Sequence, residues 1–322
     1  MRLLFAERFA ERIMGRPWLL DLVYRMEAGL MYLLWWFLMA LGPERASRLG
    51  SALLRRLGPR SRKKAELVRQ TLRLLCPGSS EEDLEAMVDR SWDNLGAVFG
   101  EYANLERIGA SERLEIVDEV GIEQYCDGTR GAVFFGVHYA NWELMPLALA
   151  RAGVPLAVIY APLANPYLDR LMSRARTQLD CVTHARGASI RPLLKHLRAG
   201  GSIGTLIDLR MPEGAEVPFF GHPTRLPSTA ARLALGTGCD LVPVRIDRVA
   251  RARYRVTFES VLPVDDLQDA DDPVDAVTRR MIARAEAWIR ADPALWLLAN
   301  RRWDKVVLDP GWEARRAALL GR

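Results

Sequence analysis

From residue 131 onward, short apolar runs alternate with longer segments whose apolar residues recur at helical spacing. This alternation predicts an α/β fold with a mixed central sheet flanked by helices. We expect strands at residues 133–137, 154–160, 203–208, 241–246 and 253–259. Helices are expected between them at residues 143–152, 166–178, 188–199, 228–237 and 272–290, and before them at residues 44–57, 61–75 and 80–103.

The N-terminal part of the chain contains a strongly apolar stretch, residues 28–42, without a charged side chain. As a helix it would reach about 22 Å, less than the roughly 30 Å of a bilayer's hydrocarbon core. A tilted or shallow membrane anchor, a full span and a buried helix all remain open. The basic residues that follow would place the downstream side on the cytoplasmic face and suit an anionic membrane surface; they are Arg45, Arg48, Arg55, Arg56, Arg60, Arg62, Lys63 and Lys64. We predict a helical membrane anchor over residues 1–58 and a second domain over residues 59–322.

The formal net charge of +5 fits several classes of partner: nucleic acid, an anionic membrane, an acidic protein or a phosphorylated substrate. Nucleic acid is not expected, because the sequence has no zinc-finger spacing, RNA-binding signature or clear helix-turn-helix. The four cysteines are scattered without metal-ligand spacing, which is typical of a reduced chain facing the cytoplasm. We therefore predict no metal site.

The most reactive pair in the sequence is His138 and Glu143, where a predicted strand gives way to a predicted helix. Two residues five apart point in different directions on one helix. We therefore expect a turn at residues 138–140, Asn141 as the helix cap and Glu143 in the first helical turn. His138 would then be a neutral general base, and Glu143 would orient its ring. The alternative is a structural histidine that lies near a glutamate by chance.

These residues resemble the H-x4-[DE] motif of the lysophospholipid acyltransferase superfamily, and more closely the bacterial lipid A biosynthesis (lauroyl/myristoyl) acyltransferases. Five blocks carry the resemblance in order: Gly136–Glu143, Ile159–Leu171, Gly204–Gly221, Leu241–Val244 and Asn300–Trp303. The sequence departs from the family pattern at Ala161, where an arginine is usual, at Leu209, where a polar residue is usual, and at Asn300, where a histidine is usual.

The resemblance implies transfer of a fatty acyl chain from an acyl carrier protein thioester to a hydroxyl of a lipid A precursor-type glycolipid. His138 would take the hydroxyl proton, with no metal, cofactor or covalent enzyme intermediate. The implied partners are acyl carrier protein, the membrane glycolipid and an anionic membrane surface, and the implied location is the cytoplasmic face of the inner membrane. The same chemistry on a lysophospholipid or another glycolipid is one alternative. A non-catalytic lipid-binding relative is a second, and the intact His138 and Glu143 argue against it.

Three arginines and an aspartate complete the candidate substrate-binding set with Asn141. Asp208 ends an apolar strand, where its side chain would face a cleft, and Arg210 could share that face. Arg170 and Arg174 lie four apart on a predicted helix and could form a cationic stripe that compensates for Ala161. Ser202 lies in a G-x-S-x-G pattern, but there the predicted helix precedes the strand, the reverse of a nucleophile elbow.

Overall fold

A mixed seven-stranded sheet organises the computed structural model, which describes residues 15–160, 163–170, 181–185, 189–309 and 311. Its strand order is β1-β9-β8-β2-β5-β3-β4. The neighbours are parallel except for the antiparallel pair β8 and β9. The strands are β1 (Leu114–Asp118), β2 (Ala132–Gly136), β3 (Leu156–Tyr160), β4 (Val182–Ala185), β5 (Ser202–Leu206), β8 (Asp240–Ala250) and β9 (Arg253–Phe258).

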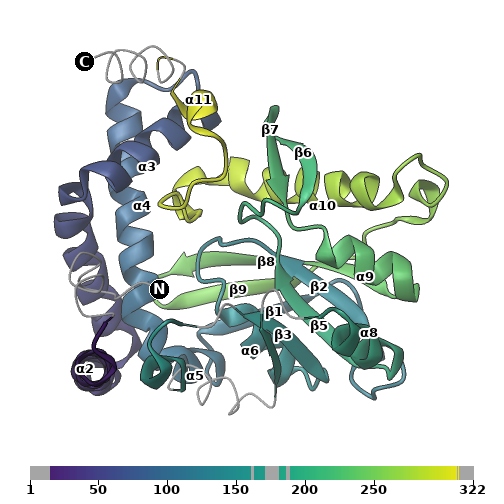
Figure 1. The fold of residues 1–322 in the computed structure, drawn as a ribbon, viewed down its shortest axis with the longest axis horizontal. Helices are drawn as coiled ribbons and strands as arrows, with labels where there is room; N and C mark the ends of the chain where they lie inside the picture. Colours follow the sequence, from purple (N-terminus) through teal and green to yellow (C-terminus); the bar gives the residue numbers. More distant parts are fainter. Residues whose placement is uncertain (1–14, 161–162, 171–180, 186–188, 310, 312–322) are drawn as a thin grey trace.

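The predicted mixed α/β fold is confirmed, because helices cover both faces of this sheet. Helix α10 (Pro273–Ala291) lies on one side of the sheet and α6 (Leu144–Arg151) on the other (Figure 1). Strand β2 lies between them, and all five of its residues are buried, as expected for a central parallel strand. The body also contains α5 (Leu105–Gly109), α8 (Arg191–Arg198), α9 (Thr229–Thr237) and α11 (Lys305–Leu308), and residues 166–170 are helical as well.

Three N-terminal helices form a layer beside the sheet: α2 (Pro17–Leu57), α3 (Arg62–Leu75) and α4 (Glu81–Glu101). Helix α4 runs past the ends of β8 and β9 (Figure 1). Helix α2 contains a kink at Gly42, whose φ of 75° lies in the left-handed region, followed by Pro43. The part before the kink exposes apolar side chains, while the part after it packs along α4.

The packing of α2 on α4 depends on glycines that let the two backbones touch. A Cβ on Gly96 would lie 2.3 Å from the carbonyl oxygen of Gly50, and a Cβ on Gly50 would lie 2.1 Å from that of Gly96. Because the obstructing atoms are backbone, a side-chain rotation cannot relieve the clash. Gly100 makes a third such contact, because a Cβ there would lie 2.1 Å from the carbonyl oxygen of Ala46, so these glycines together position the α2 segment after the kink.

Most predicted elements are present within one to three residues of their expected bounds. Strands β1 and β4 were not predicted, nor was the antiparallel hairpin of β6 (Ala215–Phe219) and β7 (His222–Leu226), whose exposed positions carry polar residues and prolines. The expected helix at 166–178 falls partly outside the described residues. The predicted boundary at residue 58 stays a prediction.

Gly96→Ala should destabilise the protein by about 1 to 3 kcal/mol, the usual penalty of forcing an extra methyl into a tight contact. Gly29→Ala is the matched control, because that helical glycine of α2 has nothing within 4 Å of an added Cβ and should gain up to about 1 kcal/mol of helix propensity. Thermal or denaturant unfolding measures both. Equal stabilities for the two variants would contradict the backbone contact.

Candidate active site

His138 and Asp208 occupy equivalent positions beyond two neighbouring parallel strands. Strand β2 pairs with β5 in a register that sets Gly136 beside Leu206, and each polar residue follows two positions later. The amide of Ile207 donates to the carbonyl oxygen of Gly136 at 3.1 Å, which continues the pairing past the strand ends. The carboxyl ends of parallel strands are where α/β proteins place their ligands. Here they bring an imidazole and a carboxylate together.

Asp208 contacts the Nδ1 atom of His138, with a separation of 2.7 Å between Nδ1 and Oδ1. The same carboxylate oxygen accepts the backbone N–H of His138 at 3.1 Å. The other oxygen, Oδ2, accepts from Nε1 of Trp296 at 2.8 Å and from Nη2 of Arg302 at 2.9 Å. The Asp208 and Arg302 side chains are both fully buried. The pair is thus closed to solvent on the Arg302 side and reaches the surface through His138.

Burial by itself would raise the pKa of the Asp208 carboxyl, but the contacts with His138, Arg302 and Trp296 outweigh it and hold that pKa well below its ordinary value. An ionised carboxylate can only accept hydrogen bonds, so Nδ1 of His138 must carry the proton that it donates. In a neutral imidazole the other nitrogen, Nε2, is then an acceptor. This arrangement gives His138 the tautomer that a general base needs.

The backbone around His138 is held by a segment near the C-terminus. We call residues 137–141 the His138 turn. Its Ala140 has a φ of 48°, which is uncommon for a residue with a side chain. The amide of Ala140 donates to the carbonyl oxygen of Leu295 at 2.9 Å, and the amide of Leu297 donates to that of His138 at 2.8 Å. These two bonds fix the turn in a conformation that its own sequence does not favour.

Glu143 and Asn141 do not occupy the places expected from the sequence. No hydrogen bond joins Glu143 to His138 among the described residues. Glu143 is instead the N-cap residue of α6, and it accepts from Nε1 of Trp142 at 3.1 Å. The Trp142 ring lies 5.2 Å from the ring of His138 between centroids, so Glu143 reaches His138 through an intervening indole. The orienting contact expected from Glu143 is made by Asp208, because strand pairing places Asp208 beside the histidine while the helix start holds Glu143 away.

Asn141 was expected to cap the helix and to lie within reach of substrate. Its side chain is fully buried, and its Nδ2 donates to Glu101 at 2.9 Å. The cap position belongs to Glu143, which makes no capping hydrogen bond from its side chain. Asn141 therefore anchors the His138 turn to helix α4.

Two of the three predicted arginines lie within the described residues, and neither forms a hydrogen bond or ion pair with His138 there. Arg210 pairs with Asp304 at 2.7 Å, and Arg170 lies over the ring of Tyr167, 5.6 Å from its centroid. Arg174 lies outside the described residues. The sequence analysis did not assign a site role to Trp296 or Arg302, although Arg302 belongs to the block Asn300–Trp303 that carried part of the resemblance.

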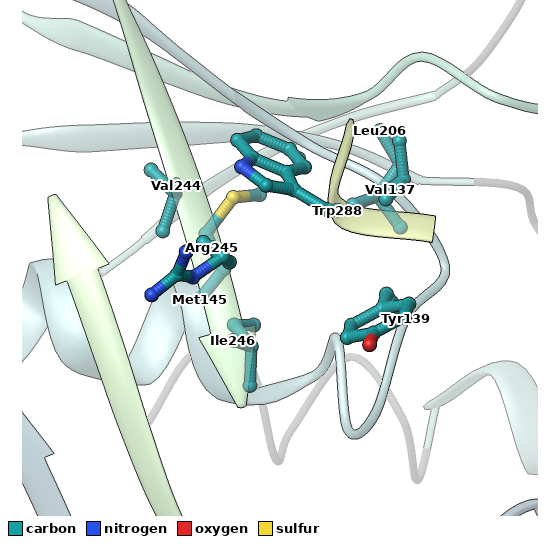
Figure 2. A pocket seen from close by; sticks show the side chains of 9 residues that line it. Val137, Tyr139, Met145, Leu206, Val244, Arg245, Ile246 and Trp288 are labelled. Atoms are coloured by element: carbon teal, nitrogen blue, oxygen red, sulfur yellow. The ribbon is translucent and has the colours of Figure 1, made fainter. Parts of the chain in front are cut away.

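A small cavity lies behind the His138 turn (Figure 2). Its volume is about 10 Å³, and Val137, Tyr139, Met145, Arg245 and Trp288 are among its lining residues. This is scarcely room for one water molecule, so the cavity does not hold an acyl chain in this structure. Among the described residues, no group of three His, Cys, Asp or Glu side chains could hold a metal ion.

Comparison with known proteins assigns the chain to a family. Residues 14–305 match the model of the family described as bacterial lipid A biosynthesis acyltransferase. A lipid A biosynthesis acyltransferase of Haemophilus influenzae is 26% identical over 258 residues, which cover 77% of this chain and 79% of that protein. A phosphatidylinositol mannoside acyltransferase of Mycolicibacterium smegmatis is 27% identical over 213 residues, which cover 65% of this chain and 67% of that protein.

Among solved structures, the crystal structure of the 1-acyl-sn-glycerophosphate acyltransferase PlsC from Thermotoga maritima covers 71% of this chain and 97% of its own. The sequence identity is 14% and the TM-score is 0.35, so no conclusion is drawn from this likeness. The family match, in contrast, spans nearly the whole chain, from before helix α2 into helix α11. The chain therefore belongs to the bacterial lipid A biosynthesis acyltransferase family and is an acyltransferase.

Proposed function

We propose that the protein transfers a fatty acyl chain from an acyl carrier protein thioester to a hydroxyl group of a lipid A precursor-type glycolipid, with His138 as the general base. The observation that carries the proposal is the contact between His138 and the buried, ionised Asp208. It leaves Nε2 without a hydrogen-bond partner among the described residues. The 14% exposure of the His138 side chain keeps it open to a substrate.

In the proposed reaction, Nε2 of His138 takes the proton of the acceptor hydroxyl as its oxygen attacks the thioester carbonyl carbon. The tetrahedral intermediate collapses, the carbon–sulfur bond breaks, and the imidazolium returns its proton to the departing thiolate. The products are an ester and a free thiol. Asp208 stabilises the transient imidazolium without becoming protonated, since the buried Arg302 holds its charge in place. General-base assistance of this kind contributes roughly 10²- to 10⁴-fold in rate.

A second acceptor class is supported by the names of the relatives. A phosphatidylinositol mannoside acyltransferase acts, by its name, on a mannosylated phosphatidylinositol rather than on a lipid A precursor. Both acceptors are anionic glycolipids that present sugar hydroxyls, so the same base would serve either. An acceptor panel should therefore include both, together with a lysophospholipid.

The exposed face of α2 supports a membrane location. Before the kink the helix exposes a row of large apolar side chains, namely Trp18, Leu22, Met26, Leu30, Leu33, Leu34, Trp36 and Phe37. By length and composition alone the helix could cross a bilayer, which is weak support for a span. The helix is also tied to the body along this stretch. Tyr167 Oη donates to Asp21 at 2.7 Å, and Asn104 Nδ2 donates to the carbonyl oxygen of Leu38 at 2.9 Å.

Asp21 and Leu38 are 17 residues apart, or about 25 Å along a helix at 1.5 Å per residue. A helix held to the protein at both ends of that length presents one face to lipid. We therefore propose that α2 lies in the interface of the inner membrane with its apolar row inserted, and that the active site faces the cytoplasm.

Replacing His138 tests its role as the base. His138→Ala should lower acyl transfer at least a hundredfold when purified protein is given radiolabelled acyl carrier protein thioester and the acceptor panel. His222→Ala, at an exposed position on β7, is the matched control and should keep normal activity. The acceptor that becomes labelled identifies the substrate class, and a parallel reaction with acyl coenzyme A tests the donor. Equal labelling by wild type and His138→Ala would remove His138 as the base.

Replacing Asp208 and Glu143 one at a time separates the roles of the two carboxylates. Asp208→Asn should lower kcat at least a hundredfold, because an amide can donate to Nδ1 and so favour the wrong tautomer. Glu143→Gln should lose less, since an amide oxygen can still accept from Trp142. Melting curves are needed as a control, because Asp208→Asn leaves Arg302 buried without its counter-charge. A larger loss in Glu143→Gln than in Asp208→Asn would show that Glu143 contacts His138 directly during turnover.

Replacing apolar residues on the exposed face of α2 tests its insertion into the membrane. Leu30→Asp with Leu33→Asp should weaken binding to vesicles of anionic phospholipid at least tenfold, because burial of each leucine contributes about 1.5 to 3 kcal/mol. Leu53→Asp with Leu57→Asp, the same double change at two exposed positions after the kink, should leave binding unchanged. Vesicle flotation measures both. Unaltered binding of the first double variant would count against insertion of this face.

A further inference from the structure

A buried glutamate, Glu101, joins four separate parts of the molecule to one carboxylate. Glu101 is the last residue of α4, and its side chain is fully buried. Oε1 accepts from Ser47 Oγ and from Arg248 Nη1, both at 2.7 Å. Oε2 accepts from Asn141 Nδ2 at 2.9 Å and from the hydroxyl of Tyr254. These donors come from helix α2, strand β8, the His138 turn and strand β9, and together they occupy the four acceptor positions of the carboxylate.

Arg248 extends the network to a second residue of the His138 turn, Ala140. Its Nε donates to Asn94 Oδ1 at 3.0 Å, and Asn94 Nδ2 donates to the carbonyl oxygens of Leu295 at 3.0 Å and of Ala140 at 3.4 Å. Leu295 is also the residue that accepts the amide of Ala140. The turn is therefore held at Ala140 and at Asn141, two and three residues after His138.

Packing alone does not account for Asn141. Its side chain is fully buried, yet Oδ1 is among the buried polar atoms without a hydrogen-bond partner in the described part of the chain. An apolar residue of similar size would avoid that penalty. What Asn141 provides is a donor aimed at Glu101, and so a fixed distance between the His138 turn and helix α4. An unpaired buried polar atom next to reactive groups is typical of a functional constraint.

We propose that Glu101 is a positioning residue for the acyl transfer: through Asn141 it holds the His138 turn in the conformation that keeps the His138 ring on Asp208. Glu101 and Asn141 are buried and touch neither substrate nor reacting atoms, so they act through the geometry of His138. The inference rests on the proposed role of His138 as the base. A misplacement of about 1 Å in a reacting group can lower the rate roughly a hundredfold, which is ample for such an effect.

Three variants separate positioning from simple stabilisation, because each removes one hydrogen-bond donor from the same carboxylate. Asn141→Ala breaks the link to the His138 turn, while Ser47→Ala and Tyr254→Phe break the links to α2 and β9. All three should lower the melting temperature by comparable amounts. Only Asn141→Ala should lower kcat tenfold or more, with the KM for the acyl donor little changed. A kcat for Asn141→Ala within twofold of that for Ser47→Ala would overturn the proposal.

A second readout does not depend on turnover. The chain has four histidines, so the rate at which diethyl pyrocarbonate modifies each can be followed by peptide mass spectrometry. A loosened turn should raise the rate at His138 several-fold in Asn141→Ala, but not in Ser47→Ala or Tyr254→Phe. The other three histidines are internal references. An unchanged rate at His138 in Asn141→Ala would refute positioning even if kcat fell.

The two proposals can fail independently. If His138→Ala keeps full activity, the proposed base is wrong, yet the modification rates still report whether Glu101 positions the turn. Glu101→Gln tests whether Glu101 acts through Asn141. If this variant folds, combining it with Asn141→Ala should lower kcat no further than Glu101→Gln alone. Multiplied losses would mean that the two residues act separately. If Glu101→Gln does not fold, the comparison of Asn141→Ala with Ser47→Ala still decides.

Discussion

The ion pair of Asp208 and Arg302 is fully buried, and the place of His138 depends on it. Removing two charges from water costs several kcal/mol per ion, and only close pairing with further hydrogen bonds offsets that cost. Both partners have such bonds: Trp296 donates to Asp208, and Arg302 donates to the carbonyl oxygens of Asn300 at 2.6 Å and of Asp208 at 3.0 Å. The segment around residue 300 must therefore fold back onto the sheet before Asp208 can stay ionised next to His138. The candidate site is completed by Trp296 and Arg302, which lie 88 and 94 positions beyond the aspartate that they stabilise.

A second buried ion pair, Glu101 with Arg248, supports the same turn from the side of helix α4. Strained backbone persists where the surroundings over-determine it, and Ala140, with its positive φ, is hydrogen-bonded to Leu295 and to Asn94, a partner of Arg248. The glycine contact between α2 and α4 also supports the network around Glu101. Ser47, three residues before Gly50, reaches Glu101 from α2, so the close approach of the two helices also brings that donor into range. The helical layer thus contributes to the site through contacts that are buried at Glu101 and partly buried at Arg248.

Much of the fold could be predicted from the sequence, because strand β2 is a continuous apolar run and α6 follows it with helical spacing. The pairing of His138 with Asp208 could not. It depends on β5 lying beside β2, and nothing in the order of elements along the chain specifies which parallel strands are neighbours. The H-x4-E spacing instead drew attention to Glu143, which is close in sequence but is directed to Trp142. Arg302 was visible in the block Asn300–Trp303, yet its burial against Asp208 is a consequence of tertiary folding. The polar hairpin of β6 and β7 escaped prediction because its exposed face weakens the apolar signal that identifies strands.

The division between buried and exposed charges decides which of them can be replaced without loss of stability. Asp208, Arg302, Glu101 and Arg248 are removed from solvent, and replacing any one of them would leave an unpaired charge inside the protein. Arg170, Arg210 and Arg301 lie at or near the surface, where substitutions usually change stability by no more than about 0.5 kcal/mol. Surface cations can therefore be exchanged at little cost in stability, while the buried charges around His138 cannot.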